Sequence, residues 1–205
     1  MTRRRLALGI AAIGGLLLVA LLSRVARVPD GEMAPSLLPG DFVLILPLAP
    51  RVGDVVAVVD PLDAERWTLR RVEAIGGAVS YDGGTFRTSE QRKVKLLDMG
   101  EYLGRPVHLE GEHLVLRAAA PTRMTVTDVG VPDDSAFLGA DDRDGALDSR
   151  WWGPVPLGAL RGVVFARVGS PATPWRGVFG VRGEPAVIPK SSKLGPPPAN
   201  PLSRP

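Results

Sequence analysis

The chain has 205 residues, 45% of them hydrophobic, which suits one globular domain with an anchor and a tail, and its 24 glycines and 20 prolines favour a mainly β fold. The absence of cysteine excludes disulfides, thiolate catalysis and cysteine-ligated metals. The net charge is only +3, and the basic residues are scattered among acidic ones, so no nucleic-acid partner is indicated.

Residues 1–27 have the pattern of a basic cap and a membrane anchor. Three arginines at positions 3–5 precede a run without charged side chains at positions 6–22, and Arg24 and Arg27 follow it. As a helix, this run would span roughly 26 Å, slightly less than a hydrocarbon core of ~30 Å. A cleaved secretory signal is the alternative, although the residues after the run offer no convincing small-x-small site. We therefore expect a single-pass anchor with a cytoplasmic N-terminus and an extracytoplasmic body.

The body, residues 28–188, is predicted to be all β. Helical periodicity is weak beyond the anchor, and short valine-rich runs alternate with Gly, Pro and Asp. We expect strands at Asp41–Pro47, Val52–Val59, Thr68–Ile75, His113–Arg117 and Leu160–Val168. The polar and basic stretch at about 85–112 is expected to be a solvated loop or hairpin inserted into the sheet, with a binding patch as the alternative. Residues 189–205 are rich in proline and are expected to form a disordered tail.

The segment that follows the anchor, Val28–Asp41, reads V-P-D-G-E-M-A-P-S-L-L-P-G-D. It resembles the nucleophile motif of the type I signal peptidases, in which a serine stands between a glycine and a methionine. The position of that serine is occupied here by Glu32. The residues that keep the pattern are Gly31, Met33, Pro35, Leu37, Gly40 and Asp41.

Three further segments resemble motifs of the same family, in the same order. V-G-D-V-V at 52–56 resembles its strand-starting G-D-[IV]-V element. L-R-R-V at 69–72 stands where the family has Lys-Arg within a strand, the lysine being the general base. Residues 131–156 resemble the block V-P-x-G-x-x-F-x-x-G-D-N-R-x-x-S-x-D-S-R-x-[WF]-G-x-V-P. The residues singled out in these segments are Asp54, Arg71, Asp141, Arg143, Asp148, Ser149 and Arg150.

The resemblance implies a signal peptidase-like body of coiled antiparallel β-sheets with one N-terminal transmembrane helix. It places the protein in a bacterial inner membrane, with the body on the periplasmic or outer face. It also implies a Ser/Lys endopeptidase that removes signal peptides from exported preproteins. That chemistry requires a hydroxyl that can lose its proton, a neutral amine and donors that face the oxyanion, and it requires no metal or cofactor.

Four positions that carry this chemistry in the family are altered. Glu32 replaces the serine, and Arg70 replaces the lysine with a guanidinium, a group that stays protonated in proteins and cannot accept the proton. Asp30 stands where the family has a small residue that can help line the oxyanion hole, and its carboxylate would repel an oxyanion. Ala146 stands where a serine usually hydrogen-bonds the lysine. Because the family's serine and lysine are within hydrogen-bond reach, Glu32 and Arg70 should meet as a charge-assisted pair.

The other retained residues are expected to act as a scaffold. The resemblance implies that Asp141, Arg143, Asp148, Ser149 and Arg150 brace the base and the core loop. The retained arginines are expected to pair with Asp54, Asp141 or Asp148. Trp151 and Trp152 alternate along an extended segment, so one should be buried and the other exposed.

The sequence pattern does not favour a catalytic or metal site at the other polar residues. Asp30 and Glu32 would point to opposite sides of an extended segment, which argues against a paired-carboxylate catalyst. Ser36 is expected to have a structural role in a turn. His108 and His113 have no third ligand at metal spacing, so we expect ordinary surface or core histidines.

Three functional hypotheses remain. The first is a catalytically inactive signal peptidase homologue that binds extended peptide as an added strand, or that partners an active signal peptidase or another envelope protein. The second is an active signal peptidase that acts on exported preproteins. The third is a soluble extracytoplasmic binding domain, which requires cleavage near Ser23.

Overall fold

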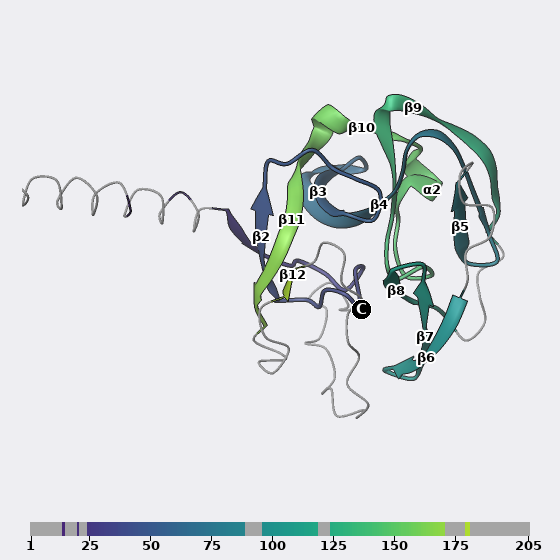
Figure 1. The fold of residues 1–205 in the computed structure, drawn as a ribbon, viewed down its shortest axis with the longest axis horizontal. Helices are drawn as coiled ribbons and strands as arrows, with labels where there is room; N and C mark the ends of the chain where they lie inside the picture. Colours follow the sequence, from purple (N-terminus) through teal and green to yellow (C-terminus); the bar gives the residue numbers. More distant parts are fainter. Residues whose placement is uncertain are drawn as a thin grey trace, which may run out of the picture.

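The computed structural model of the protein describes residues 24–88, 96–118, 124–170 and 179–180, together with Gly14 and Ala20. The main feature is a nine-stranded antiparallel sheet in the order β1-β2-β11-β3-β4-β9-β10, with β12 beside β11 and β5 beside β4 (Figure 1). Its strands are β1 (Val25–Arg27), β2 (Phe42–Leu46), β3 (Val55–Asp60), β4 (Asp63–Asp82), β5 (Thr85–Thr88), β9 (Val126–Gly139), β10 (Val155–Pro156), β11 (Leu160–Gly169) and β12 (Phe179–Gly180). The prediction of a mainly β, antiparallel body is confirmed.

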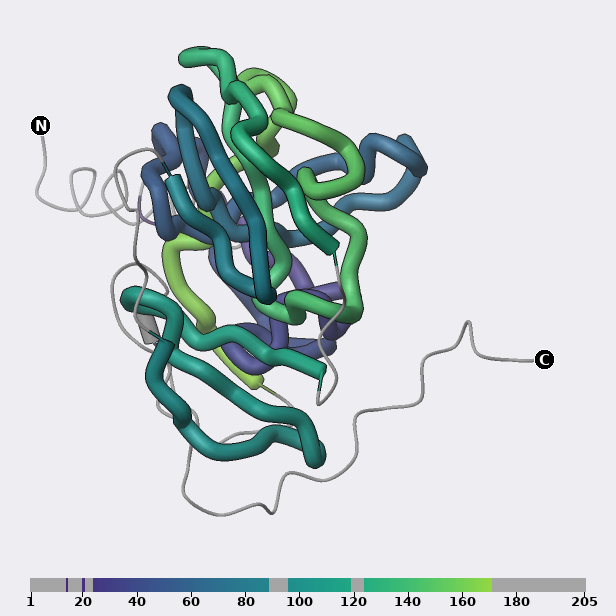
Figure 2. Tube along the Cα trace, turned by 90° about the vertical axis from the view of Figure 1, so that its right-hand side faces the viewer, coloured from purple at the N-terminus to yellow at the C-terminus, as the bar shows by residue number. Residues whose placement is uncertain are grey.

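A second, three-stranded antiparallel sheet consists of β6 (Leu96–Tyr102), β7 (Arg105–Glu110) and β8 (His113–Leu116). We call it the small sheet, and it lies at the lower end of the body in Figure 2. The stretch 85–112, predicted as one loop or hairpin, is therefore divided between β5 of the main sheet and most of the small sheet. The predicted strand at His113 also belongs to the small sheet.

The 20-residue strand β4 connects the parts of the main sheet. Its first half pairs with β3, from Asp63 opposite Asp60 to Arg71 opposite Val55. Its second half pairs with β9, starting where Arg71 faces Gly139. Only its middle was predicted, because Gly76 and Gly77, which take positive φ angles inside the strand, look like a turn in sequence.

Aliphatic side chains dominate the core. One buried cluster joins Met33 and Leu37 to Val43, Val55 and Leu69. Two others lie along the main sheet, and a fourth packs Ala34 and Leu38 against the small sheet. The segment that carries the first motif is therefore fixed from both sheets.

Most of the predicted anchor and the whole predicted tail fall on residues that the structure does not describe. No helix among the described residues is long and apolar enough to cross a membrane, and most of the predicted anchor lies outside those residues. The end of that segment differs from the prediction, because Val25–Arg27 forms β1 and pairs with β2, so the β body begins at Val25. The predicted tail at 189–205 also lies outside the described residues.

The two tryptophans do not lie on an extended segment. Ser149–Trp152 forms the short helix α2, and Leu157–Ala159 forms the 3-10 helix η1. The predicted difference in burial is nevertheless present, because Trp151 is 63% exposed while Trp152 packs against a core cluster.

Gly162 provides a test of the main sheet. It lies in β11 at a register shift against β3, with a φ of +147°, and an added Cβ would be 2.7 Å from the carbonyl oxygen of Leu46. Gly162→Ala should therefore lower the free energy of unfolding by about 1–3 kcal/mol, measured by urea denaturation. Gly158→Ala is the control, since a Cβ there meets nothing within 4 Å. Equal denaturation midpoints for the two variants would contradict this account of β11.

Candidate functional site

The segment after β1 forms a series of turns in place of an extended strand. Its ends are held together where the backbone N–H of Val28 donates to the carbonyl of Asp41 at 2.8 Å. Inside the segment, Asp41 accepts the backbone N–H of Leu38, and Asp30 accepts that of Glu32 at 3.1 Å. The peptide bond before Pro35 is cis. Gly31 lies next to Pro39, because a Cβ added to Gly31 would be 3.6 Å from Cγ of Pro39.

The structure brings Glu32 and Arg70 into direct contact. A guanidinium N–H on Nη2 of Arg70 donates to Oε2 of Glu32 at 2.5 Å. The Arg70 side chain is 1% exposed and that of Glu32 is 17% exposed. The predicted charge-assisted pair is therefore present, and the functional role of the two residues remains a prediction.

The rest of the Arg70 guanidinium is also bonded. Nη1 donates to the hydroxyl of Thr68 and to the carbonyl of Leu69, both at 2.6 Å. Nε and Nη2 donate to the carbonyl of Leu147, at 3.0 and 2.6 Å. With the bond to Glu32, all five N–H groups of a guanidinium have acceptors. The face of Trp152 lies 5.2 Å from the guanidinium carbon and closes the site on another side.

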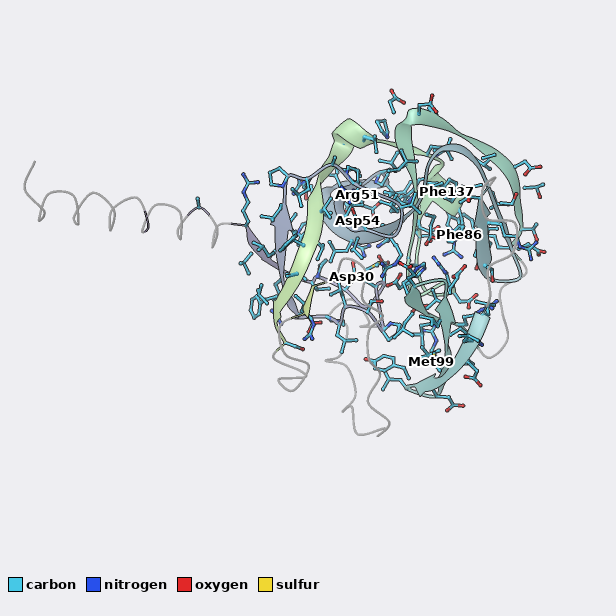
Figure 3. The ribbon with its side chains drawn as sticks, in the orientation of Figure 1. Asp30, Arg51, Asp54, Phe86, Met99 and Phe137 are labelled. Carbon is cyan, nitrogen blue, oxygen red and sulfur yellow. The ribbon has the colours of Figure 1, made fainter. Side chains whose placement is uncertain are left out.

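Asp30 and Glu32 do not point to opposite sides, which corrects the prediction. Both carboxylates accept from the hydroxyl of Thr68 at 3.3 Å. Both also face Arg66, at 3.0 Å from Asp30 and 3.4 Å from Glu32. Side chains alternate between two sides only along an extended strand, whereas Asp30 and Glu32 lie in a tight turn. The turn brings both side chains over β4, and Figure 3 labels Asp30 in this part of the body.

Arg66 and Thr68 were not identified from the sequence. Both lie in β4, four and two residues before Arg70 respectively, and side chains at this spacing share one face of a strand. The Arg66 side chain is 43% exposed and is also within 3.8 Å of Asp60. The alternation of side chains along the strand was the signal that could have identified them, because every second residue before Arg70 lies on the same face.

Arg71 forms the other strong pair of β4. Its Nε and Nη2 donate to the two carboxylate oxygens of Asp141, at 2.7 and 2.6 Å, and Nη1 donates to the carbonyl of Gly53. Burial by itself would lower the pKa of Arg71, but the Asp141 carboxylate more than offsets this, so the pKa is raised. The predicted partnership with Asp141 is found. Ser36 lies beside the pair, with its hydroxyl 3.4 Å from Arg71 Nη2 and 3.5 Å from the Leu114 carbonyl, in a structural position.

The last motif braces the end of β9. Asp148 accepts a bidentate pair from Arg150 at 2.8 and 2.7 Å, and also the backbone N–H of Ala140 at 2.9 Å. The hydroxyl of Ser149 accepts the backbone N–H of Leu138. These contacts are those expected of a scaffold.

Asp54 accepts the backbone N–H of Arg51 at 2.9 Å and so shapes the turn before β3. The pairing predicted for Arg143 differs from the structure. Arg143 binds Glu73 and Glu110, at 2.8 and 2.7 Å, which were not among its predicted partners. Those two glutamates are far from Arg143 in sequence and outside the recognised motifs, so no local pattern could identify them.

A pocket of about 300 Å³ opens beside the ion pair. Glu32, Arg143 and Arg150 contribute polar surface to it, while Ala146, Leu147 and Trp151 contribute apolar surface. The two arginines already have carboxylate partners, so the pocket mainly offers an apolar wall next to the Glu32 carboxylate. Its volume is sufficient for one amino-acid side chain.

The arrangement at the ion pair offers little for nucleophilic catalysis. Arg70 has no lone pair to accept a proton, and a carboxylate such as Glu32 is a poor nucleophile toward an amide. The nearest hydroxyl, that of Thr68, is fully buried and already bonded to Arg70, Asp30 and Glu32.

Comparison with known proteins identifies related chains. The model of the family described as "Signal peptidase, peptidase S26" matches residues 1–169. The chain is 24% identical over 193 residues to "Signal peptidase I" of Aquifex aeolicus, covering 70% of this chain and 75% of the relative. It is 28% identical over 145 residues to "Probable signal peptidase I-2" of Synechocystis sp., covering 68% of this chain and 60% of that relative's length. Among solved structures, a signal peptidase I from Enterococcus faecalis V583 is 21% identical, with coverage of 58% of this chain and 99% of that one and a TM-score of 0.35.

The Arg71–Asp141 pair makes a testable contribution to stability. Arg71→Ala should destabilise the protein by about 3–5 kcal/mol, because it leaves the buried Asp141 carboxylate without its cation. Arg105→Ala is the matched control, since Arg105 forms a bidentate pair with Asp142 but its side chain is 33% exposed. The control should lose no more than about 1 kcal/mol. Urea denaturation measures both, and similar losses would contradict this ranking.

Proposed function

Because the chain belongs to the signal peptidase family, peptidase S26, we propose that it is a member that binds extended peptide without cleaving it. The observation that carries the proposal is the contact between Glu32 and Arg70 at the positions where the family motifs have serine and lysine. An acid and a permanent cation that neutralise each other supply neither a nucleophile nor a base. The protein then acts by holding a segment of an exported preprotein, or of another envelope protein, beside this pair.

The pairing of β4 supports a binding mode in which peptide adds as a strand. Asp63 and residues 67–70 pair with β3 on one edge, while pairing with β9 begins only at Arg71. Among the described residues, no strand pairs with the other edge of 63–70. Unpaired backbone N–H and C=O groups on such an edge can bind an extended peptide through main-chain hydrogen bonds. The pocket beside Glu32 can then receive a side chain of that peptide.

The proposal includes a location. The apolar run at positions 6–22 would act as a single membrane anchor, with the basic residues at positions 3–5 on the cytoplasmic side. The β body would then lie at the outer face of the membrane, close to exported chains as they emerge.

The second candidate is an active signal peptidase, and membership of the family favours it. It requires a nucleophile other than a serine at position 32 and a base other than a lysine at position 70. A cleavage assay distinguishes the two candidates.

The full-length chain in detergent micelles should release no mature product from a preprotein that carries a cleavable signal peptide. An active signal peptidase I serves as the positive control, and gel mobility with mass spectrometry of the product measures cleavage. Release of mature product by the natural chain, together with its loss in Glu32→Ala, would establish the second candidate. Product that persists in Glu32→Ala would indicate a contaminating peptidase.

Binding should depend on the pocket. Ala146→Phe fills the pocket and should weaken binding of a fluorescent peptide from the cleavage region of a preprotein at least about tenfold, or roughly 1.4 kcal/mol. Fluorescence anisotropy measures the affinity. Ala159→Phe is the control, because Ala159 is an exposed alanine of η1 and does not line the pocket. Equal affinities for the two variants would count against peptide binding in this pocket.

A further inference from the structure

A second charged cluster is buried next to the pocket that Glu32 lines, since its central residue lines the same pocket. The proposed function gives no role to its two glutamates, Glu73 and Glu110. Its centre is Arg143, which is 1% exposed. Nη1 of Arg143 donates to Glu73 at 2.8 Å, while Nη2 and Nε donate to Glu110 at 2.7 and 3.2 Å. Glu73 and Glu110 are 7% and 3% exposed. Two buried carboxylates therefore share one guanidinium.

The cluster joins the two sheets. Glu73 belongs to β4 of the main sheet, Glu110 to β7 of the small sheet, and Arg143 to the loop after β9. The same loop bonds to β8, because the backbone N–H of Arg143 donates to the carbonyl of Leu116 at 3.0 Å. The small sheet is thus held to the body through Arg143 as well as through the apolar contacts of Ala34 and Leu38.

The space around the carboxylate of Glu73 is closed. A Cβ on Gly139 would lie 2.6 Å from Oε1 of Glu73 and 2.7 Å from both Nη1 of Arg143 and a ring carbon of Phe86. Phe86 lies over the Arg143 guanidinium at 4.6 Å and packs edge-on against Phe137 (Figure 3). Little room is left for water to solvate an ionised carboxylate there.

The charges that face Glu73 do not balance when it is ionised. Arg71 and Arg143 provide two positive charges, while Glu73, Glu110 and Asp141 provide three negative ones. His113 lies 3.3 Å from Arg143, but burial and then the two arginines lower its pKa well below the ordinary value, so it is neutral and adds no positive charge. Arg150, farther out, is paired with Asp148. Protonation of Glu73 removes the excess negative charge.

We propose that Glu73 is a proton switch, whose protonation tightens the docking of the small sheet onto the main sheet through Arg143 and Glu110. The proposal does not depend on peptide binding or on the catalytic state of the Glu32–Arg70 pair. In the protonated state, Arg143 is neutralised by Glu110 and the cluster is balanced. In the ionised state, a carboxylate that has lost most of its solvation weakens the contact between the sheets.

The direction of the pH dependence follows from linkage. Burial raises the pKa of Glu73 to about 7; attraction to Arg143 opposes this shift, and the Glu110 charge adds to it. In an undocked state, an exposed glutamate has a pKa of about 4.3. The docked state therefore binds the proton more tightly, and its stability falls as the pH rises toward 7 and levels off above it. Between pH 6 and pH 8, the docking equilibrium should weaken about tenfold.

Hydrogen exchange on the full-length chain in detergent micelles tests the proposal. Protection factors of β7 and β8 amides, corrected for the intrinsic effect of pH, should fall about tenfold from pH 6 to pH 8. In Glu73→Gln, which mimics the protonated side chain, protection should be the same at both pH values. Glu112→Gln, in the exposed turn between β7 and β8, is the control and should keep the tenfold change.

An unchanged tenfold difference in Glu73→Gln, or no difference in the natural chain, would overturn the proposal. A direct measurement covers the case in which Glu73→Gln does not fold. The assigned side-chain carboxyl carbon of Glu73 in the natural chain should titrate in NMR spectra with a midpoint near pH 7. A midpoint below about pH 5, the range of an ordinary glutamate, would overturn the proposal by itself.

Discussion

The structure depends on the acceptors that surround the guanidinium of Arg70. A buried cation is tolerated only where a counter-charge and hydrogen-bond acceptors replace its lost solvation. Here one carboxylate, one hydroxyl and two main-chain carbonyls do so. Those acceptors belong to three separate segments, namely the turn at Glu32, β4 itself and the loop at Leu147. The charge therefore fixes the relative positions of these segments, and the pocket beside Glu32 is a result of that arrangement.

The alternation of β4 places two charged networks on opposite faces of the strand, although Arg143 of the second network also lines the pocket beside Glu32. Arg66, Thr68 and Arg70 share one face of the strand and meet the turn that carries Asp30 and Glu32. Arg71 and Glu73 share the opposite face and meet the loop that carries Asp141 and Arg143. One face supports the proposed binding site, and the other connects the main sheet to the small sheet. A single-residue shift of register would exchange these environments.

The sequence predicted those strands and contacts that depend on a short run of residues or on a recognised motif. Valine-rich runs located β2, β3 and β11, and the resemblance to the signal peptidase motifs implied the contact between Glu32 and Arg70. The misses have physical causes. In β9, the run from Gly130 through Pro132 to the adjacent Asp133 and Asp134 resembles a turn. Glu110 reaches Arg143 only because a separate sheet folds back onto the body. Partners that tertiary structure alone brings together leave no signal in neighbouring residues.

The five bonds of Arg70 also bear on how such a chain can change over generations. A lysine at this position has three donors on one nitrogen, so it could not serve all the acceptors that the fork of a guanidinium reaches. A change to serine at position 32 alone would leave a buried cation without its carboxylate, and a change to lysine at position 70 alone would leave carbonyls without donors. The two positions are therefore coupled, so the residue at one of them limits which residues the other can accept over evolutionary time.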